Sequence, residues 1–155
     1  MEFEEVIDKY SGIITKICYY FASNVDEFKD IRQDVWINIW KGRDKFRNES
    51  SLSTWIYRVS FNTCISYQRK NKLKTVPLSI ETLAEIPDNT DFDISKYNEM
   101  HRLINSLSLR ERAIILMWLD EKSYDEIAEI TGMPRNTIAV KLKRIKEKLV
   151  KLSNQ

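Results

Sequence analysis

Residues 123–138 read SYDEIAEITGMPRNTI, and this stretch predicts two helices joined by a tight turn. Ser123 precedes Glu126 by three residues, the spacing of a capping box at a helix N-terminus. Gly132 suits the left-handed conformation that ends a helix, and Pro134 suits the first turn of the next one. Apolar residues then recur at helical spacing, namely Ile138, Leu142, Ile145, Leu149 and Leu152. The pattern predicts a helix-turn-helix unit.

The second helix of this unit is strongly basic. Residues 134–152 carry seven Lys or Arg side chains and one acidic side chain, Glu147. In a helix-turn-helix unit the second helix enters the major groove, where its first turns contact base edges and other cations contact phosphates. The candidate DNA contacts are Arg135, Asn136, Thr137, Val140, Lys141, Lys143 and Arg144. The alternative is a basic amphipathic helix that pairs with a partner helix.

Three further amphipathic helices are predicted in the first half of the chain. Apolar residues follow helical spacing over Phe3–Tyr20 and again over about Asp26–Lys41, with Gly42 ending the second helix. A polar, basic loop follows. Ser53 is the predicted N-cap of a third helix that reaches about Lys72. These three helices can bury a shared core.

The composition favours an all-α fold. The chain has three Gly and three Pro among 155 residues, whereas these two residue types usually make up ~12% of a protein. Helical patterning fades from Leu73 to about Asp93, where Pro77 and Pro87 interrupt it. We therefore predict two small helical domains, residues 1–74 and 96–155, joined by a flexible linker of residues 75–95.

The charge is unevenly distributed along the chain. The net charge of the whole protein is +2, but residues 29–74 carry +7 and residues 101–155 carry +4. The segments 1–28 and 75–100 carry −4 and −5. Two basic blocks separated by an acidic one indicate two sites for a polyanion. Solvated faces on basic helices are the alternative explanation.

Several other classes of protein do not fit the sequence. Cys18 and Cys64 with the single His101 cannot supply a tetrahedral zinc site, so no metal and no cofactor are expected. Acidic residues do not cluster with His101, and no Gly-rich phosphate loop is present, so an enzyme is not expected. The start of the chain is acidic, and no apolar run approaches the ~20 residues of a membrane span. We expect a cytoplasmic protein without membrane insertion.

Two stretches together resemble one family. Residues 123–138 resemble region 4 of the bacterial sigma-70 family, especially its extracytoplasmic-function (ECF) group. Residues 30–36 (DIRQDVW), with Trp40 and Phe46, and residues 53–62 (STWIYRVSFN) resemble region 2 of the same family in the same order. The resemblance implies an alternative sigma factor that binds core RNA polymerase and recognises −35 and −10 promoter elements. It implies a three-helix region 2 domain and a helix-turn-helix region 4 domain.

The resemblance also assigns residues. In the family, the helix that matches Asp26–Lys41 docks on the clamp helices of the largest polymerase subunit, and the matching positions here are Asp30, Gln33, Asp34, Ile37 and Trp40. The loop that matches Asp44–Leu52 and the following helix capture an unstacked base of the −10 element. The candidates for that role are Arg47, Asn48, Ser51, Trp55, Arg58 and Asn62. Beside them, Arg69 and Lys70 at the basic end of the helix would follow the DNA backbone. Three tryptophans can alternatively be core residues, namely Trp36, Trp40 and Trp55.

Further partners follow from the same resemblance. They are the flap of the second-largest polymerase subunit, promoter DNA and an anti-sigma factor that masks both domains, and a sigma factor in holoenzyme associates with the nucleoid. Val140 stands where the family more often has Ser, which leaves the −35 sequence open. A helix-turn-helix regulator that acts without being a polymerase subunit is the alternative function.

Overall fold

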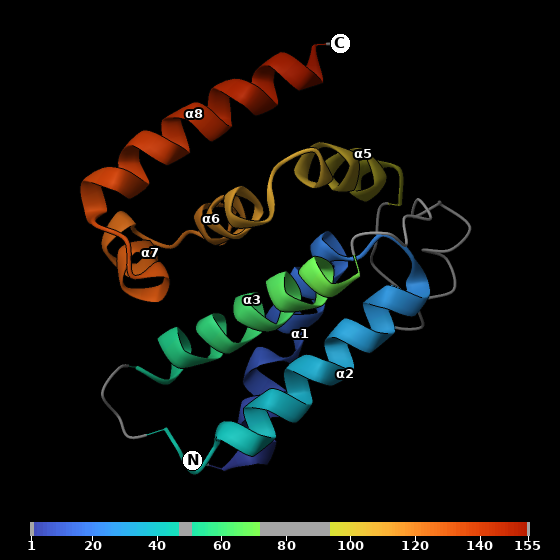
Figure 1. The fold of residues 1–155 in the computed structure, drawn as a ribbon, viewed down its shortest axis with the longest axis vertical. Coiled ribbons are helices and arrows are strands. Elements are labelled where there is room, and N and C mark those ends of the chain that lie inside the picture. The colour runs from blue at the N-terminus through green and yellow to red at the C-terminus, as the bar shows by residue number, and fades with distance from the viewer. Residues whose placement is uncertain (1, 47–50, 72–93, 155) are drawn as a thin grey trace.

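The computed structural model describes residues 2–46, 51–71 and 94–154, and in these residues all regular structure is helical (Figure 1). Three helices come from the first half of the chain: α1 (Phe3–Phe21), α2 (Val25–Gly42) and α3 (Leu52–Lys70). Four come from the second half: α5 (Ile94–Asn105), α6 (Leu109–Leu119), α7 (Tyr124–Thr131) and α8 (Arg135–Ser153). The prediction of an all-α fold is confirmed.

Helices α1, α2 and α3 pack into a bundle around one apolar core. Each helix contributes the stripe of apolar residues that its sequence pattern predicts, including Ile14, Phe21, Phe28, Ile31, Ile39, Ile56 and Phe61. Glu27 is the acidic side chain in this core, and it accepts hydrogen bonds from Ser23 N at 3.1 Å and Gln68 Nε2 at 2.8 Å. A buried carboxylate with such partners is tolerated because its hydrogen bonds to water are replaced.

The start of α3 differs from the prediction by two residues. Ser51, and not Ser53, is the N-cap, because the Ser51 hydroxyl accepts a hydrogen bond from Thr54 N at 3.1 Å. The end of α2 lies against this turn. A Cβ atom at Gly42 would come within 2.8 Å of Trp55 Cζ2, so the absence of a side chain at Gly42 lets the indole pack closely.

Helices α7 and α8 form the predicted helix-turn-helix unit, and α6 packs against both of them. Ser123 and Glu126 make the capping box of α7, and Gly132 ends that helix with a φ of 76°. A second capping box, formed by Ser108 and Glu111, starts α6. The buried stripe of α8 consists of Ile138, Leu142 and Ile145, and it completes an apolar core with Ile114, Ile115 and Met117 of α6.

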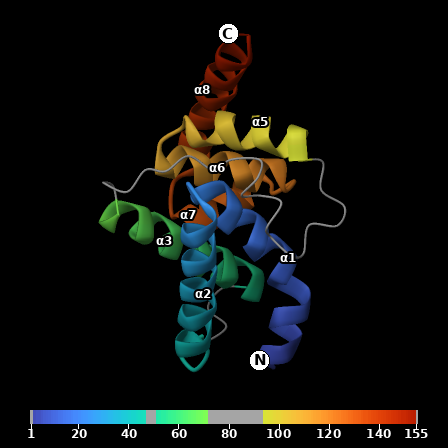
Figure 2. The same ribbon diagram turned by 90° about the vertical axis from the view of Figure 1, so that its right-hand side faces the viewer.

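The two groups of helices lie directly against each other. Helix α3 runs beside α6 and α7, and the end of α1 lies beside α5 and α6 (Figures 1 and 2). The N-terminus and the C-terminus lie at opposite ends of the molecule. One side of α3 therefore forms part of the contact between the two halves of the chain.

Two glycines provide a test of the turn conformation. Gly132→Ala should lower the free energy of unfolding by about 1 kcal/mol, because a side chain at positive φ is strained. Gly12→Ala should raise it by about 0.5–1 kcal/mol, because Gly12 lies within α1 with open space where an added methyl group would lie. Urea denaturation followed by circular dichroism measures both, and equal effects would contradict this account of the turn.

Candidate nucleic-acid and polymerase interfaces

Helix α8 presents a basic face to solvent. Its buried stripe turns the opposite side outward, and that side carries Asn136, Val140, Lys141, Lys143 and Arg144, all of them exposed or half-buried. Thr137 is half-buried. No described residue forms an ion pair or hydrogen bond with the side chains of Lys141, Lys143 or Arg144, so these cations are available to an anionic partner.

Arg135 is placed differently from the other candidates on α8. Its Nε lies 3.1 Å from Asp125 Oδ1, and its guanidinium lies 5.8 Å from the centre of the Tyr124 ring. Both side chains of the ion pair are largely exposed, so the pair adds little stability. Its effect is to hold the guanidinium beside the start of α7.

The candidate residues for the −10 element lie along α3. Ser51 caps the helix, and Trp55 is half-buried against Phe46, with ring centres 5.5 Å apart. Asn62, Arg69 and Lys70 are exposed, and Arg58 is half-buried. Arg47 and Asn48 lie outside the described residues. Trp55 is thus both a packing residue and partly accessible.

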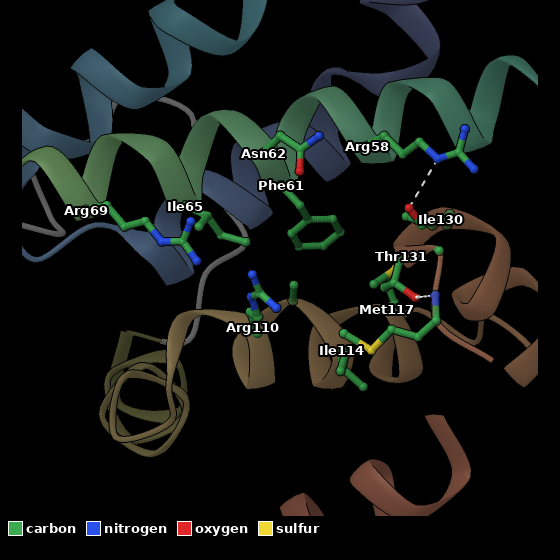
Figure 3. A pocket seen from close by; sticks show the side chains of 13 residues that line it. Arg58, Phe61, Asn62, Ile65, Arg69, Arg110, Ile114, Met117, Ile130 and Thr131 are labelled. Carbon is green, nitrogen blue, oxygen red and sulfur yellow. Dashed lines mark hydrogen bonds between the residues drawn. The ribbon is translucent and has the colours of Figure 1, made fainter. Parts of the chain in front are cut away.

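A cavity of about 480 Å³ lies between part of α3, α6 and the turn after α7 (Figure 3). Its floor is apolar and includes Phe61, Ile65, Ile114 and Met117. Three arginines from two helices line it, Arg58 and Arg69 from α3 and Arg110 from α6, together with Asn62. The structure therefore brings three of the −10 candidates, Arg58, Asn62 and Arg69, to the boundary between the two halves of the chain.

The candidate polymerase-binding residues share one face of α2. Asp30, Gln33, Asp34, Ile37 and Trp40 are at least partly accessible. Ile37 is 40% exposed and Trp40 is 47% exposed, which is high for apolar side chains of this size. The Trp40 ring lies 4.9 Å from the Phe3 ring and 3.5 Å from the Arg43 guanidinium, so the indole is held in place. Trp36 packs on the core, with its ring 6.0 Å from Phe3.

A tyrosine borders the acidic part of this face. The Tyr67 hydroxyl donates a hydrogen bond to Asp30 Oδ2 at 3.2 Å. Burial, followed by the Asp30 charge, raises the pKa of Tyr67 to about 12. The phenol therefore keeps its proton and remains a donor to this carboxylate at neutral pH.

The described residues hold no group of three His, Cys, Asp or Glu side chains that could bind a metal ion. Cys18 and Cys64 are buried, and burial, followed by a hydrogen bond with Cys18, raises the pKa of the Cys64 thiol. A buried protonated thiol reacts poorly.

Among the described helices, none has the length and apolar character needed to span a membrane.

Comparison with known proteins assigns both halves of the chain. Residues 6–74 match the family model for sigma-70 region 2, and residues 97–149 match that for sigma-70 region 4. The chain belongs to the sigma-70 family. We refer to α1–α3 as the region 2 domain and to α5–α8 as the region 4 domain.

Relatives place this sigma factor in the ECF group. It is 31% identical to the ECF RNA polymerase sigma-E factor of Escherichia coli K12, covering 94% of this chain and 83% of that protein. It is 28% identical to the ECF RNA polymerase sigma factor SigW of Bacillus subtilis, covering 96% and 87%. The chain is thus an alternative sigma factor for RNA polymerase, as its sequence predicts.

Two solved structures share the fold over nearly the whole chain. Sigma factor RpoE in complex with the anti-sigma factor NepR from Bartonella quintana has a TM-score of 0.77 and 21% identity, covering 98% of this chain and 96% of that one. CnrH in complex with the cytosolic domain of CnrY has a TM-score of 0.72 and 16% identity, covering 98% and 87%. Both likenesses extend across the region 2 and region 4 domains together.

One contact between the two domains lies at the end of α1. Two backbone carbonyl groups there accept hydrogen bonds from side chains of α5. His101 Nε2 lies 2.8 Å from Ala22 O, and Asn105 Nδ2 donates to Tyr20 O at 3.0 Å. Burial lowers the pKa of His101, which favours the neutral ring at this contact. The Arg112 guanidinium lies 5.7 Å from the Phe21 ring, and burial lowers the pKa of Arg112.

Several side chains that join the two domains were not predicted from the sequence. They include Tyr57, His101, Asn105, Arg112 and Asp120. Each lies in an ordinary helical pattern or at its end, and their partners are distant in sequence. His101 is the single His of the chain, so the sequence draws attention to it as a possible metal ligand. Nothing in the residues around it predicts a contact between the two domains.

Proposed function

We propose that this sigma factor binds core polymerase and promoter DNA through three separate faces. The observation that carries the proposal is that the region 2 and region 4 matches occur in order, with most candidate contact residues accessible. The first face is the α2 surface, which docks on the clamp helices of the largest subunit. Ile37 and Trp40 support this role, because accessible apolar residues ringed by charges are typical of protein interfaces.

The second face is the basic side of α8, which reads the −35 element. Lys141 and Arg144 would contact guanine edges or phosphates, Asn136 would pair with adenine, and Val140 would pack on a thymine methyl group. Val140 is 49% exposed and suits that apolar contact. The region 4 domain also binds the flap of the second-largest subunit in this proposal.

The third face comprises the loop before α3 and the helix itself, which capture an unstacked base of the −10 element. Arg47, Asn48 and Ser51 lie in or beside that loop in the sequence, and Trp55 offers an aromatic surface. Asn62 offers an amide that both donates to and accepts from a base edge. Arg58, Arg69 and Lys70 would neutralise phosphates.

The setting of the protein follows from this function. It acts without catalytic residues, in the cytoplasm and on the nucleoid when part of holoenzyme. Residues 1–74, 75–95 and 96–155 are its functional divisions. An anti-sigma factor that covers both domains is a further proposed partner, supported by the likeness to RpoE bound to NepR.

Run-off transcription tests the proposal directly. Core polymerase is incubated with a pool of upstream sequences, with and without the protein. Initiation that depends on the protein and selects a subset of the pool is the expected result. Selective duplex binding by the protein alone, without initiation, would instead favour a helix-turn-helix regulator.

Asn62 is predicted to contribute to −10 opening. Asn62→Ala should slow open-complex formation roughly 5- to 100-fold, because a paired amide discriminates a base by about 1–3 kcal/mol. Permanganate reactivity of unpaired thymines in the −10 element measures this effect. On a template already unpaired at −10, where no opening is needed, holoenzyme with Asn62→Ala should still bind more weakly, since the contact to the base itself is lost.

The control is Asn154→Ala, which removes an exposed amide just beyond the end of α8. This variant should open promoters at the wild-type rate. Both variants should bind core polymerase equally well. Unchanged opening by Asn62→Ala would remove Asn62 from the −10 site.

A further inference from the structure

The cavity between α3, α6 and the turn after α7 is positively charged. The described residues that line it include Arg58, Arg69 and Arg110 and no acidic side chain. Arg69 and Arg110 are exposed, and neither forms an ion pair or a hydrogen bond with a described residue. A cleft lined by charges of one sign concentrates ions of the opposite sign. The lining therefore favours an anionic occupant.

The three arginines reach the cavity from both domains. Arg69 of α3 and Arg110 of α6 extend toward one another in Figure 3. The third, Arg58, is fixed by the end of α7, because its Nε donates to Ile130 O at 3.2 Å and its Nη2 donates to Glu129 O. It caps the last turn of α7, where carbonyl groups lack intrahelical donors. A guanidinium has five N–H donors, so Arg58 keeps donors for a further partner.

The positive groups are spread along the cavity. Arg58 and Arg69 are eleven positions apart on α3, which corresponds to about 16 Å along a helix axis. An occupant that meets all three arginines must therefore be elongated. Arg69 and Arg110 together suit a phosphate chain, because guanidinium groups bind phosphate oxygens in pairs of charge-assisted hydrogen bonds.

Another part of the lining is apolar and suits a flat ring. Phe61 and Ile65 come from α3, Met117 comes from α6, and Met133 follows the turn after α7. Methionine side chains adapt their shape and make favourable sulfur contacts with aromatic rings. Asn62 lines the same cavity, and its amide can both donate to and accept from the edge of a base.

The volume of the cavity fits a small molecule of this kind. At about 480 Å³ it falls within the range of about 300–1,000 Å³ that is typical of ligand sites, which combine apolar walls with a few converging polar groups. A single inorganic phosphate would leave the apolar wall unused. A fatty acid would bring one negative charge to three arginines. A nucleoside with several phosphates matches both parts of the lining.

We propose that this cavity is a binding site for a nucleoside polyphosphate. The phosphates lie between Arg69 and Arg110, and the base lies against the apolar wall toward Arg58 and Asn62. The site goes beyond the proposed function, because Arg110 has no role assigned in DNA or polymerase binding. Neither promoter nor polymerase is needed for the ligand to bind.

Isothermal titration calorimetry of the full chain measures binding, with adenosine triphosphate and guanosine triphosphate as the probes in magnesium-free buffer. Inorganic tripolyphosphate supplies the phosphates without a base. At least one of the two nucleotides should bind with one-to-one stoichiometry. It should bind roughly 5- to 100-fold more tightly than tripolyphosphate, the usual gain from stacking one base on a protein surface.

Arg110→Gln should weaken binding of that nucleotide roughly 10- to 100-fold, the usual effect of losing hydrogen bonds to a charged group. Arg102→Gln is the matched control. Arg102 is also an exposed arginine of the region 4 domain, but it lies outside the cavity lining and pairs with Glu99 on the surface. This control should bind the nucleotide as wild type does. Thermal unfolding without nucleotide should be the same for both variants and the wild type.

Four outcomes would overturn the site or its ligand. Lack of binding by both nucleotides would overturn the site. Equal losses in the two variants would show general attraction to a basic protein. Equal affinity for nucleotide and tripolyphosphate would remove the base from the assignment. If a single-stranded oligonucleotide alone bound in a manner that depends on Arg110, the cavity would belong to the DNA strand. Failure of run-off transcription would bear on the proposed function alone.

Discussion

Ile37→Glu is expected to weaken binding to core polymerase about 30-fold or more, the effect of losing one central interface residue. Ile37 is exposed in the middle of the α2 face, between Asp34 and Trp40. Docking would bury the new carboxylate without a partner, and burial of an unpaired charge is costly. Glutamate is a good helix former, so α2 itself should persist. Titration of labelled protein with core polymerase, followed by fluorescence anisotropy, gives the affinity.

Ile7→Glu is a closely matched control. Ile7 is 37% exposed on α1 and Ile37 is 40% exposed on α2, so both variants place a carboxylate on an equally accessible apolar position. Only the change on α2 should reduce binding. Equal losses would point to a general effect of negative charge, and intact binding by Ile37→Glu would remove α2 from the polymerase interface.

The double variant Lys141→Ala and Arg144→Ala is expected to reduce run-off transcription from a −35-dependent promoter roughly 30-fold or more, since a base-reading cation contributes about 1–3 kcal/mol. Both side chains are exposed on α8, and no described residue pairs with them. Folding should be unaffected, because Ile138, Leu142 and Ile145 supply the packing. The salt dependence of promoter binding should also become weaker, because fewer counterions are released.

Lys148→Ala with Lys151→Ala removes the same charge from the far end of the same helix. Lys148 pairs with Glu111 at 3.5 Å on the surface, a contact of small energetic value. This control should retain −35-dependent transcription. If the two double variants lost activity equally, bulk charge rather than base recognition would explain the role of α8.

The local structure of this sigma factor could be predicted closely from its sequence. The expected helices Phe3–Tyr20 and Asp26–Lys41 are observed as Phe3–Phe21 and Val25–Gly42. The capping box of α7 and the glycine that ends it are confirmed. The predicted N-cap of α3 is wrong because Ser51 and Ser53 are equally suitable in sequence, and only the bond from Thr54 N distinguishes them.

The sequence by itself determined the all-α class, the order of the two sigma regions and the basic face of α8, because helix periodicity, caps and charge are local properties of the chain. Only the tertiary structure decided that Arg58 caps α7 and that Tyr57 meets Asp120. These partners are separated by more than sixty positions in the sequence. Contacts across such distances depend on how two folded domains pack, and no periodic pattern in either helix encodes that packing.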